Sequence, residues 1–128
     1  EIRPVDPVDI FKPEVRPPFR QSWLKAQGQL PDDPIVHRCL LAYASDFNFL
    51  GPALQPHGMT FADRRVQAAS LDHAIWFHRD FRMDDWLLYD KDSPSASGGR
   101  GLNRGNIFSR DGVLVASTAQ EALIRRRR

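Results

Sequence analysis

Cysteine is almost missing from this sequence: Cys39 is the only one in 128 residues. A disulfide within the chain is therefore excluded, and the apolar segment around Cys39 indicates a small buried hydrophobic side chain. Without a cross-link, the chain must rely on its own hydrophobic core. Its length suffices for about one domain.

Long hydrophobic runs are missing as well. No stretch approaches the roughly 18 consecutive apolar residues of a membrane-spanning helix, and no signal-peptide pattern is present. We expect no membrane span and a bacterial cytoplasmic location. The sequence starts at Glu1 rather than methionine, which indicates a processed product or a piece of a longer protein. No peroxisomal tripeptide stands at Arg128, but a peroxisomal location stays open if the chain continues beyond it.

A strong excess of one charge is also absent. The formal net charge is +2, but Arg125–Arg128 supply four of the 18 basic residues, which leaves 14 basic against 16 acidic residues elsewhere. A slightly acidic body is a poor electrostatic partner for nucleic acid, and the four arginines are typical of a solvated tail. We therefore expect no nucleic-acid binding.

Signatures of metal, nucleotide and covalent chemistry are lacking. His73 and His78 are five residues apart on an expected strand, so they point to opposite faces and predict no metal site. The glycine spacing in residues 99–105 misses the dinucleotide fingerprint by one residue and precedes a strand pattern, not a helix. We expect residues 93–101 to be a flexible loop, and we expect no cofactor. No Gly-x-Ser-x-Gly motif is present.

One long helix is expected in the first half of the chain. Asp33 fits the N-cap and Pro34 the first helical position. Apolar residues then recur around nearly the whole circumference, which is typical of a buried helix. The main row is Val36, Leu40, Tyr43, Phe47 and Leu50. We expect this helix to run from Asp33 to about Leu50 and to end at Gly51-Pro52.

Strand patterns dominate the second half. They cover residues 66–81, 85–90, 102–109 and 113–124, and Asp111-Gly112 predicts a hairpin between the last two. Shorter strands are expected at residues 1–5 and 21–27, separated by a proline-rich connector at residues 6–20. This order predicts an α+β domain in which an antiparallel sheet is wrapped around the helix.

Three polar residues could form a hydrolytic site. Asp46 lies in the apolar helix, where a carboxylate is costly unless it is paired or hydrogen-bonded. Ser70 and Gln120 lie on expected strands, and the three side chains together could hold one water molecule against a carbonyl group. Singly, each has an ordinary explanation: Asp46 can cap a turn or face solvent, and Ser70 and Gln120 can be satisfied sheet residues.

Four blocks of sequence, in this order, resemble the type II acyl-CoA thioesterases: residues 41–50 (LAYASDFNFL), 70–78 (SLDHAIWFH), 93–101 (SPSASGGRG) and 111–121 (DGVLVASTAQE). That family has two hot-dog domains per chain. The resemblance extends from Ile2 to Arg125 and is to the C-terminal domain, which implies that residues 1–128 form a single hot-dog domain.

The resemblance also implies a function, the hydrolysis of acyl-CoA thioesters. In the family, a water molecule is oriented by an aspartate, a threonine or serine, and a glutamine, and these positions are Asp46, Ser70 and Gln120 here. Asp46 would act as general base without a covalent intermediate or a metal. Two departures are Ser70, where threonine is frequent, and Asp80, where proline is usual.

Substrate contacts are predicted from the residues. Arg100 and Arg104 beside the glycine-rich segment are candidates for the CoA phosphates, and Trp76 is a candidate for the acyl chain. The expected partners are the acyl-CoA substrate and either the N-terminal hot-dog domain or further copies of the chain. Two alternatives are a non-catalytic acyl-CoA-binding or assembly half, and a hot-dog hydratase with His73 or His78 beside Asp46.

Overall fold

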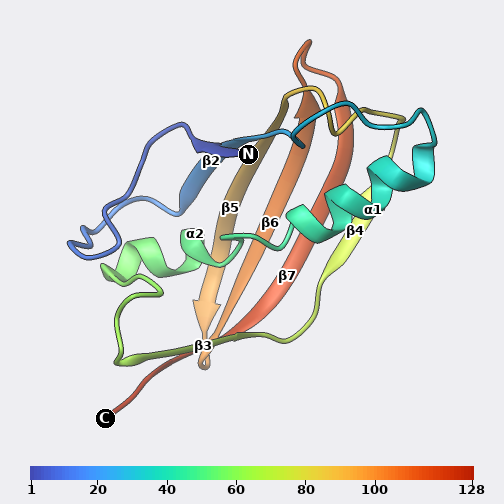
Figure 1. Cartoon of the computed structure of the whole chain (residues 1–128). Helices are drawn as coiled ribbons and strands as arrows, with labels where there is room; N and C mark the ends of the chain where they lie inside the picture. Colours follow the sequence, from blue (N-terminus) through green and yellow to red (C-terminus); the bar gives the residue numbers. More distant parts are fainter.

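A seven-stranded antiparallel sheet curls around two short helices (Figure 1). The computed structural model describes residues 1–128. In chain order the elements are β1 (Ile2–Pro4), β2 (Phe19–Leu24), α1 (Pro34–Ala44), α2 (Gly51–Leu54), a 3-10 turn (Gln55–His57), β3 (Val66–Ser70), β4 (Ala74–Phe77), β5 (Leu87–Ser97), β6 (Arg100–Ser109) and β7 (Leu114–Arg126). The predicted α+β class is confirmed, and no helix is long and apolar enough to cross a membrane.

Strand β7 holds the sheet together because it pairs with three other strands. The strands lie in the order β1-β2-β5-β6-β7-β3, and β4 also pairs with β7. One long side of β7 faces β6. On the other side, β3 pairs with the end of β7, with Ser70 opposite Ala122, and β4 pairs with its middle, with Ala74 opposite Ala119. The single expected strand 66–81 is thus two strands, separated by three residues.

The single helix predicted from Asp33 to about Leu50 is shorter in the structure and is interrupted. Asp33 is its N-cap as predicted, because its carboxylate accepts a hydrogen bond from Ile35 N at 3.0 Å. However, α1 ends at Ala44, where the Ser45 hydroxyl donates back to Ala42 O at 2.8 Å. Asn48 then adopts a left-handed backbone conformation (φ 54°), which a helix cannot include. Gly51-Pro52 was expected to end the helix but instead begins α2, since proline suits a first turn.

The face that α1 buries also differs from the prediction. Its buried residues are His37 and Leu41, whereas Tyr43 is 69% exposed and Phe47, just beyond the helix, 41% exposed. Cys39 is exposed rather than buried. The apolar pattern correctly predicted a helix. The prediction that this helix is buried on all sides was wrong, because the sheet covers only one side of it (Figure 1).

The glycine-rich segment is a tight hairpin rather than a flexible loop. Strand β5 continues to Ser97 and β6 begins at Arg100, so only Gly98 and Gly99 form the turn. Both have positive φ angles, +61° and +76°, which the two central residues of such a turn require. The predicted Asp111-Gly112 hairpin is confirmed, with Gly112 N donating to Ser109 O at 2.9 Å.

Close packing between the sheet and α2 depends on Gly101 of β6. A Cβ atom at this position would lie 2.8 Å from the Ala53 Cβ of α2 and 2.6 Å from Ile124 Cδ1. Both distances are shorter than any normal carbon contact, so only glycine allows this approach. The same region holds the smaller core cluster of Leu50, Ala53, Leu54 and Ala122, which anchors α2 against the sheet.

The N-terminal segment Asp6–Pro18 has no regular structure, and its four prolines explain why. Strand β2 already begins at Phe19, two residues earlier than expected, so the last two residues of the predicted connector belong to the sheet. The segment passes along the outside of β2 on its way into the sheet (Figure 1).

Lys91 is an unusual residue of the sheet interior. Its side chain is only 2% exposed, and it faces inward on β5 with Leu87 and Tyr89. None of the ion pairs in the structure includes it; its ammonium group lies 4.9 Å from the centroid of the Tyr89 ring. Burial, and to a lesser degree the charge of Arg20, lowers the pKa of Lys91 from 10.5 to about 8.

We predict that Lys91→Met stabilises the fold by about 3 kcal/mol at pH 7, the cost implied by lowering the pKa of this ammonium group from 10.5 to about 8. The unfolded chain binds this proton more tightly than the folded chain, so wild-type stability rises between these two pH values. The variant lacks that rise. Urea unfolding at pH 7 and above pH 10.5 measures both effects, with Lys12→Met at an exposed position as control. Equal stability of variant and wild type at pH 7 would contradict the expected cost.

Candidate active site

Asp46, Ser70 and Gln120 come together at one place in the structure. Gln120 Nε2 donates a hydrogen bond to Asp46 Oδ1 at 2.9 Å, across 74 residues of sequence. Ser70 lines the same two pockets as this pair, with volumes of about 230 and about 420 Å³. The three candidate residues therefore share one site, as their predicted roles require.

Each of the three comes from a different element. Asp46 lies in the turn after α1, Ser70 is the last residue of β3, and Gln120 points inward from β7. Gln120 is 1% exposed, while Asp46 and Ser70 are exposed. The expectation of a buried Asp46 is wrong, because its neighbours Tyr43 and Phe47 are themselves exposed and do not cover it.

The orientation of the Gln120 amide follows from its contact with Asp46. A carboxylate accepts hydrogen bonds, so the NH₂ group must face Asp46 and the carbonyl oxygen must point away. Gln120 Oε1 is buried and has no hydrogen-bond partner in the protein. A buried carbonyl oxygen without a partner is costly, and this one is free to accept a hydrogen bond from a water molecule.

The break in the edge strand fixes the backbone around the site. Between β3 and β4, Leu71 N and Asp72 N both donate to Glu121 O, at 3.0 and 3.4 Å. The Asp72 carboxylate accepts from Glu121 N at 2.6 Å. An irregularity of this kind re-aims side chains next to functional sites. Here it lies directly beside Ser70 and Gln120.

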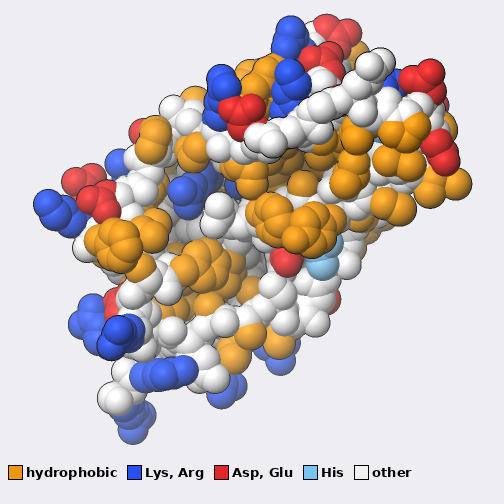
Figure 2. Space-filling view, viewed as in Figure 1, with side chains coloured by type: hydrophobic (Ala, Val, Ile, Leu, Met, Phe, Trp, Pro, Cys, Tyr) orange, Lys and Arg blue, Asp and Glu red, His pale blue; other side chains and the backbone are white.

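Ser45 anchors the turn that carries Asp46. Its only hydroxyl hydrogen goes to Ala42 O at 2.8 Å, so its 2.8 Å contact with His73 Nε2 requires that His73 donates. His73 also packs edge-on against Phe49, with ring centroids 5.6 Å apart. Sequence reasoning missed both Ser45 and this role of His73. Asp46 and His73 line one pocket. Figure 2 shows an acidic side chain and a histidine side by side, next to hydrophobic side chains.

Tyr89 ties the same turn to the sheet. Its hydroxyl donates to Ser45 O at 2.8 Å and is 2.8 Å from Thr118 Oγ1. Burial, more than the nearby charge of Asp46, raises the pKa of Tyr89 well above its ordinary value. The phenol therefore stays protonated and keeps donating to Ser45, so the backbone before Asp46 is held from two sides.

The candidates for substrate binding are not part of this site. Arg104 and Trp76 line another pocket on the outer face of the sheet, opposite to the face that carries Gln120. Arg104 forms a bidentate pair with Asp92 at 2.7 and 3.1 Å, and Arg100 pairs with Glu121 at 3.0 Å. Their role in binding CoA phosphates stays a prediction, as does the role of Trp76. A phosphate would have to displace these carboxylates first.

Comparison with known proteins identifies the family. The family model described as "Acyl-CoA thioesterase" matches residues 3–123. The chain belongs to the acyl-CoA thioesterase family. It is 48% identical over 109 residues to the acyl-CoA thioesterase 2 of Haemophilus influenzae, an alignment that covers 85% of this chain and 38% of that protein.

Solved structures agree with this family and with the fold. The acyl-CoA thioesterase II TesB2 of Mycobacterium marinum is 45% identical, with a TM-score of 0.80 over 98% of this chain and 48% of that chain. A protein of Alicyclobacillus acidocaldarius described as having a hot-dog fold has a TM-score of 0.72 at 19% identity, over 97% of this chain and 44% of that chain. The predicted hot-dog fold is confirmed. The chain spans less than half the length of the curated relatives it matches.

We predict that His73→Ala lowers kcat of the family's hydrolysis reaction several-fold while KM changes little, because the turn that carries Asp46 loses its bond to the edge strand. His73→Gln, which keeps an N–H donor, should restore part of the rate. The control is His78→Ala: that ring contacts Ser117 Oγ at 2.9 Å, away from the two pockets of the site. Steady-state kinetics measure kcat and KM of each variant. An equal decrease in kcat in both alanine variants would mean that His73 has no positioning role.

Proposed function

We propose that this chain is the C-terminal hot-dog domain of a longer acyl-CoA thioesterase and that it hydrolyses acyl-CoA thioesters to a free carboxylic acid and CoA. The family supports the reaction class. The observation that carries the assignment to residues is the contact between Gln120 and Asp46, with Ser70 in the same pockets.

The proposed mechanism needs one water molecule. Asp46 accepts a proton from it, while Ser70 Oγ and the free Gln120 Oε1 hold it in place. The water oxygen attacks the thioester carbonyl carbon, and the C–S bond breaks when the tetrahedral intermediate collapses. The departing CoA thiolate takes the proton back from Asp46. No covalent intermediate with the protein forms, and the carboxylate is regenerated.

Gln120 contributes in two ways. Its NH₂ group keeps Asp46 in a fixed orientation, and its carbonyl oxygen is left over for the water. A single amide thus couples the base to the nucleophile. A serine at position 70 keeps the hydroxyl that is needed for the third contact, although it lacks the methyl group that restricts the rotamer of threonine.

We predict that Asp46→Asn lowers kcat about 10²–10⁴-fold, the usual loss when a general base is removed. Asp46 is exposed, so the fold and its melting temperature should be unaffected. Ser70→Thr should retain activity and Ser70→Ala should lose it. Asp80→Asn, an exposed residue that pairs with Arg38, is the matched control. Hydrolysis of hexanoyl-CoA, followed by release of free thiol, measures all four; wild-type turnover in Asp46→Asn would rule out the base.

The second part of the proposal is a partner for the exposed side of α1. Ile35, Cys39 and Tyr43 are exposed and lie four residues apart on α1, and Phe47 of the following turn packs edge-on against Tyr43, so the four side chains form one apolar row. The row reaches the active site, where Tyr43 lines the same pocket as Asp46. Pockets of this size enclose only part of a CoA ester. We propose that the N-terminal hot-dog domain of the family, or a second copy of the chain, covers this row and completes the substrate site.

We predict that the chain associates and that Ile35→Glu weakens the association, because a charge would be buried in an apolar contact. Ile35 is 64% exposed, so the substitution should not disturb the fold of a single copy. Val15→Glu, at a 75% exposed position on the N-terminal segment, is the control. Light scattering across a concentration series measures the association; a wild-type monomer at every concentration that also fails to bind the N-terminal domain would refute it.

Two alternatives can be tested in the same assays. A non-catalytic acyl-CoA-binding half would bind the ester but hydrolyse it only when a catalytic partner domain is added. A hydratase would add water to an enoyl-CoA and would use a histidine beside Asp46. His73 does line that pocket, but its Nε2 is engaged with Ser45. Hydration of crotonyl-CoA by the wild type would favour the hydratase.

A further inference from the structure

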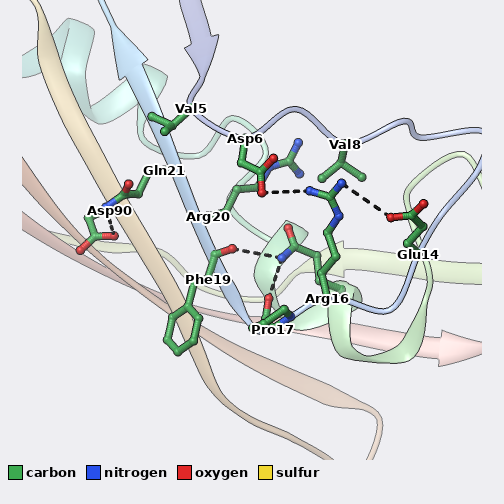
Figure 3. Close-up of a pocket in the computed structure, with 11 residues that line it drawn as sticks. Val5, Asp6, Val8, Glu14, Arg16, Pro17, Phe19, Arg20, Gln21 and Asp90 are labelled. Atoms are coloured by element: carbon green, nitrogen blue, oxygen red, sulfur yellow. Dashed lines mark hydrogen bonds and ion pairs between the residues drawn. The ribbon is translucent and has the colours of Figure 1, made fainter.

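Two cations without a carboxylate partner lie next to each other inside the sheet. Arg20 of β2 and Lys91 of β5 are direct cross-strand neighbours, and both face the concave side. Neither side chain forms an ion pair or a hydrogen bond, although another arginine that lines the pocket beside Arg20 is paired with two carboxylates. Figure 3 shows this contrast: Arg16 pairs with Asp6 and Glu14, while Arg20 has no bond drawn to it.

Unpartnered polar atoms connect this cation pair with the active site. The buried side-chain atoms that lack a hydrogen bond belong to Gln55, Asn103 and Gln120 only. Asn103 lies directly opposite Gln120 in the β6–β7 register, and it is two residues from Gly105, which lies opposite Lys91. Gln55 and Arg20 line one pocket of about 680 Å³. Unused hydrogen-bonding groups thus continue from the proposed catalytic amide to the two cations.

Ordinary packing does not account for this arrangement. A buried charge without a counter-ion costs stability, and a second cation beside it adds to that cost. If residue 91 served only to pack the interior of the sheet, an apolar side chain of similar size would be more stable there than lysine. Asn103 is 0% exposed with both amide atoms unpartnered, which is equally unfavourable in a dry core. An anion with hydrogen-bond acceptors would satisfy both cations and the NH₂ group of Asn103.

The span to the catalytic site suits an acyl group. Lys91 on β5 and Gln120 on β7 are separated by β6. Lys91 lies opposite Gly105 of β6, and Gly105 lies opposite Thr118 of β7, two residues before Gln120. With strands about 4.8 Å apart and about 3.4 Å per residue, their Cα atoms are about 12 Å apart. A chain whose thioester lies at Asp46 can cover this distance.

We propose that Arg20 and Lys91 form a carboxylate-binding site, with Asn103 as an additional hydrogen-bond donor. The carboxylate has two sources that the experiment separates: the far end of an ω-carboxyacyl group whose thioester lies at Asp46, or a free carboxylic acid that enters through the pocket in Figure 3. The planar guanidinium group of Arg20 suits a carboxylate because it can donate two parallel hydrogen bonds. The first source rests on the proposed function, while the second does not.

The kinetic arm compares hexanoyl-CoA with adipoyl-CoA, which differs by a terminal carboxylate. The measured quantity is the ratio of kcat/KM for the two esters, with the wild type, Lys91→Met, Lys91→Gln and Arg20→Gln. The wild type should favour adipoyl-CoA, and each variant should lower the ratio about 10- to 100-fold, as expected for the loss of a hydrogen bond to a charged group. Arg16→Gln is the control, because Arg16 lines the same pocket but is already paired; it should leave the ratio unchanged.

The binding arm needs no activity. Glutarate should raise the melting temperature of the wild type and of Arg16→Gln but not of Lys91→Met, and neutral glutaramide should raise none of them. If the variants change the kcat/KM ratio, the carboxylate is the far end of the acyl group. If glutarate raises the melting temperature but the ratio does not change, the site binds a free carboxylic acid. If neither arm separates wild type from Lys91→Met, the site is refuted. If the wild type hydrolyses neither ester, the result counts against the proposed function. The binding arm would then still show whether Arg20 and Lys91 bind a carboxylate.

Discussion

The pairing of β7 with three other strands is the constraint on which the rest of the structure depends. Its contact with β6 brings in the remainder of the sheet, and its other side carries both β3 and β4. Because β3 and β4 share one neighbour, the three residues between them must bulge. That irregularity places Ser70 next to Gln120 and fixes Glu121 through the Asp72 carboxylate. The same strand that closes the sheet therefore also assembles the candidate site.

Local signals in the sequence predicted those features that depend on a few adjacent residues. Asp33 caps α1 and Gly112 turns the last hairpin, because a cap and a two-residue turn need only neighbouring atoms. The end of α1 was missed because it depends on the Ser45 hydroxyl and on the left-handed Asn48, neither of which changes the apolar period. The Gly98-Gly99 hairpin was missed because the serine and glycine residues around it give a composition that is typical of loops.

The candidate site was found through the family resemblance and not through periodicity. Asp46 and Gln120 are 74 residues apart, and strand register decides whether they meet. Register also decides that Arg104 and Trp76 face away from them, although Trp76 follows His73 of the site by only three residues. The exposure of Tyr43 is a further case, because a helical pattern shows which side chains share a face but not what covers it.

The position of β7 at the end of the sequence has a consequence for biosynthesis. On the ribosome, Asp46 and Ser70 emerge long before Gln120, and β3, β4 and β6 all have an unpaired side until residues 114–126 are translated. Non-local pairing of this kind delays folding and leaves strand edges exposed meanwhile. The nascent domain thus exposes unpaired strand edges for most of its synthesis, and the contact between Gln120 and Asp46 forms only when the last strand is in place.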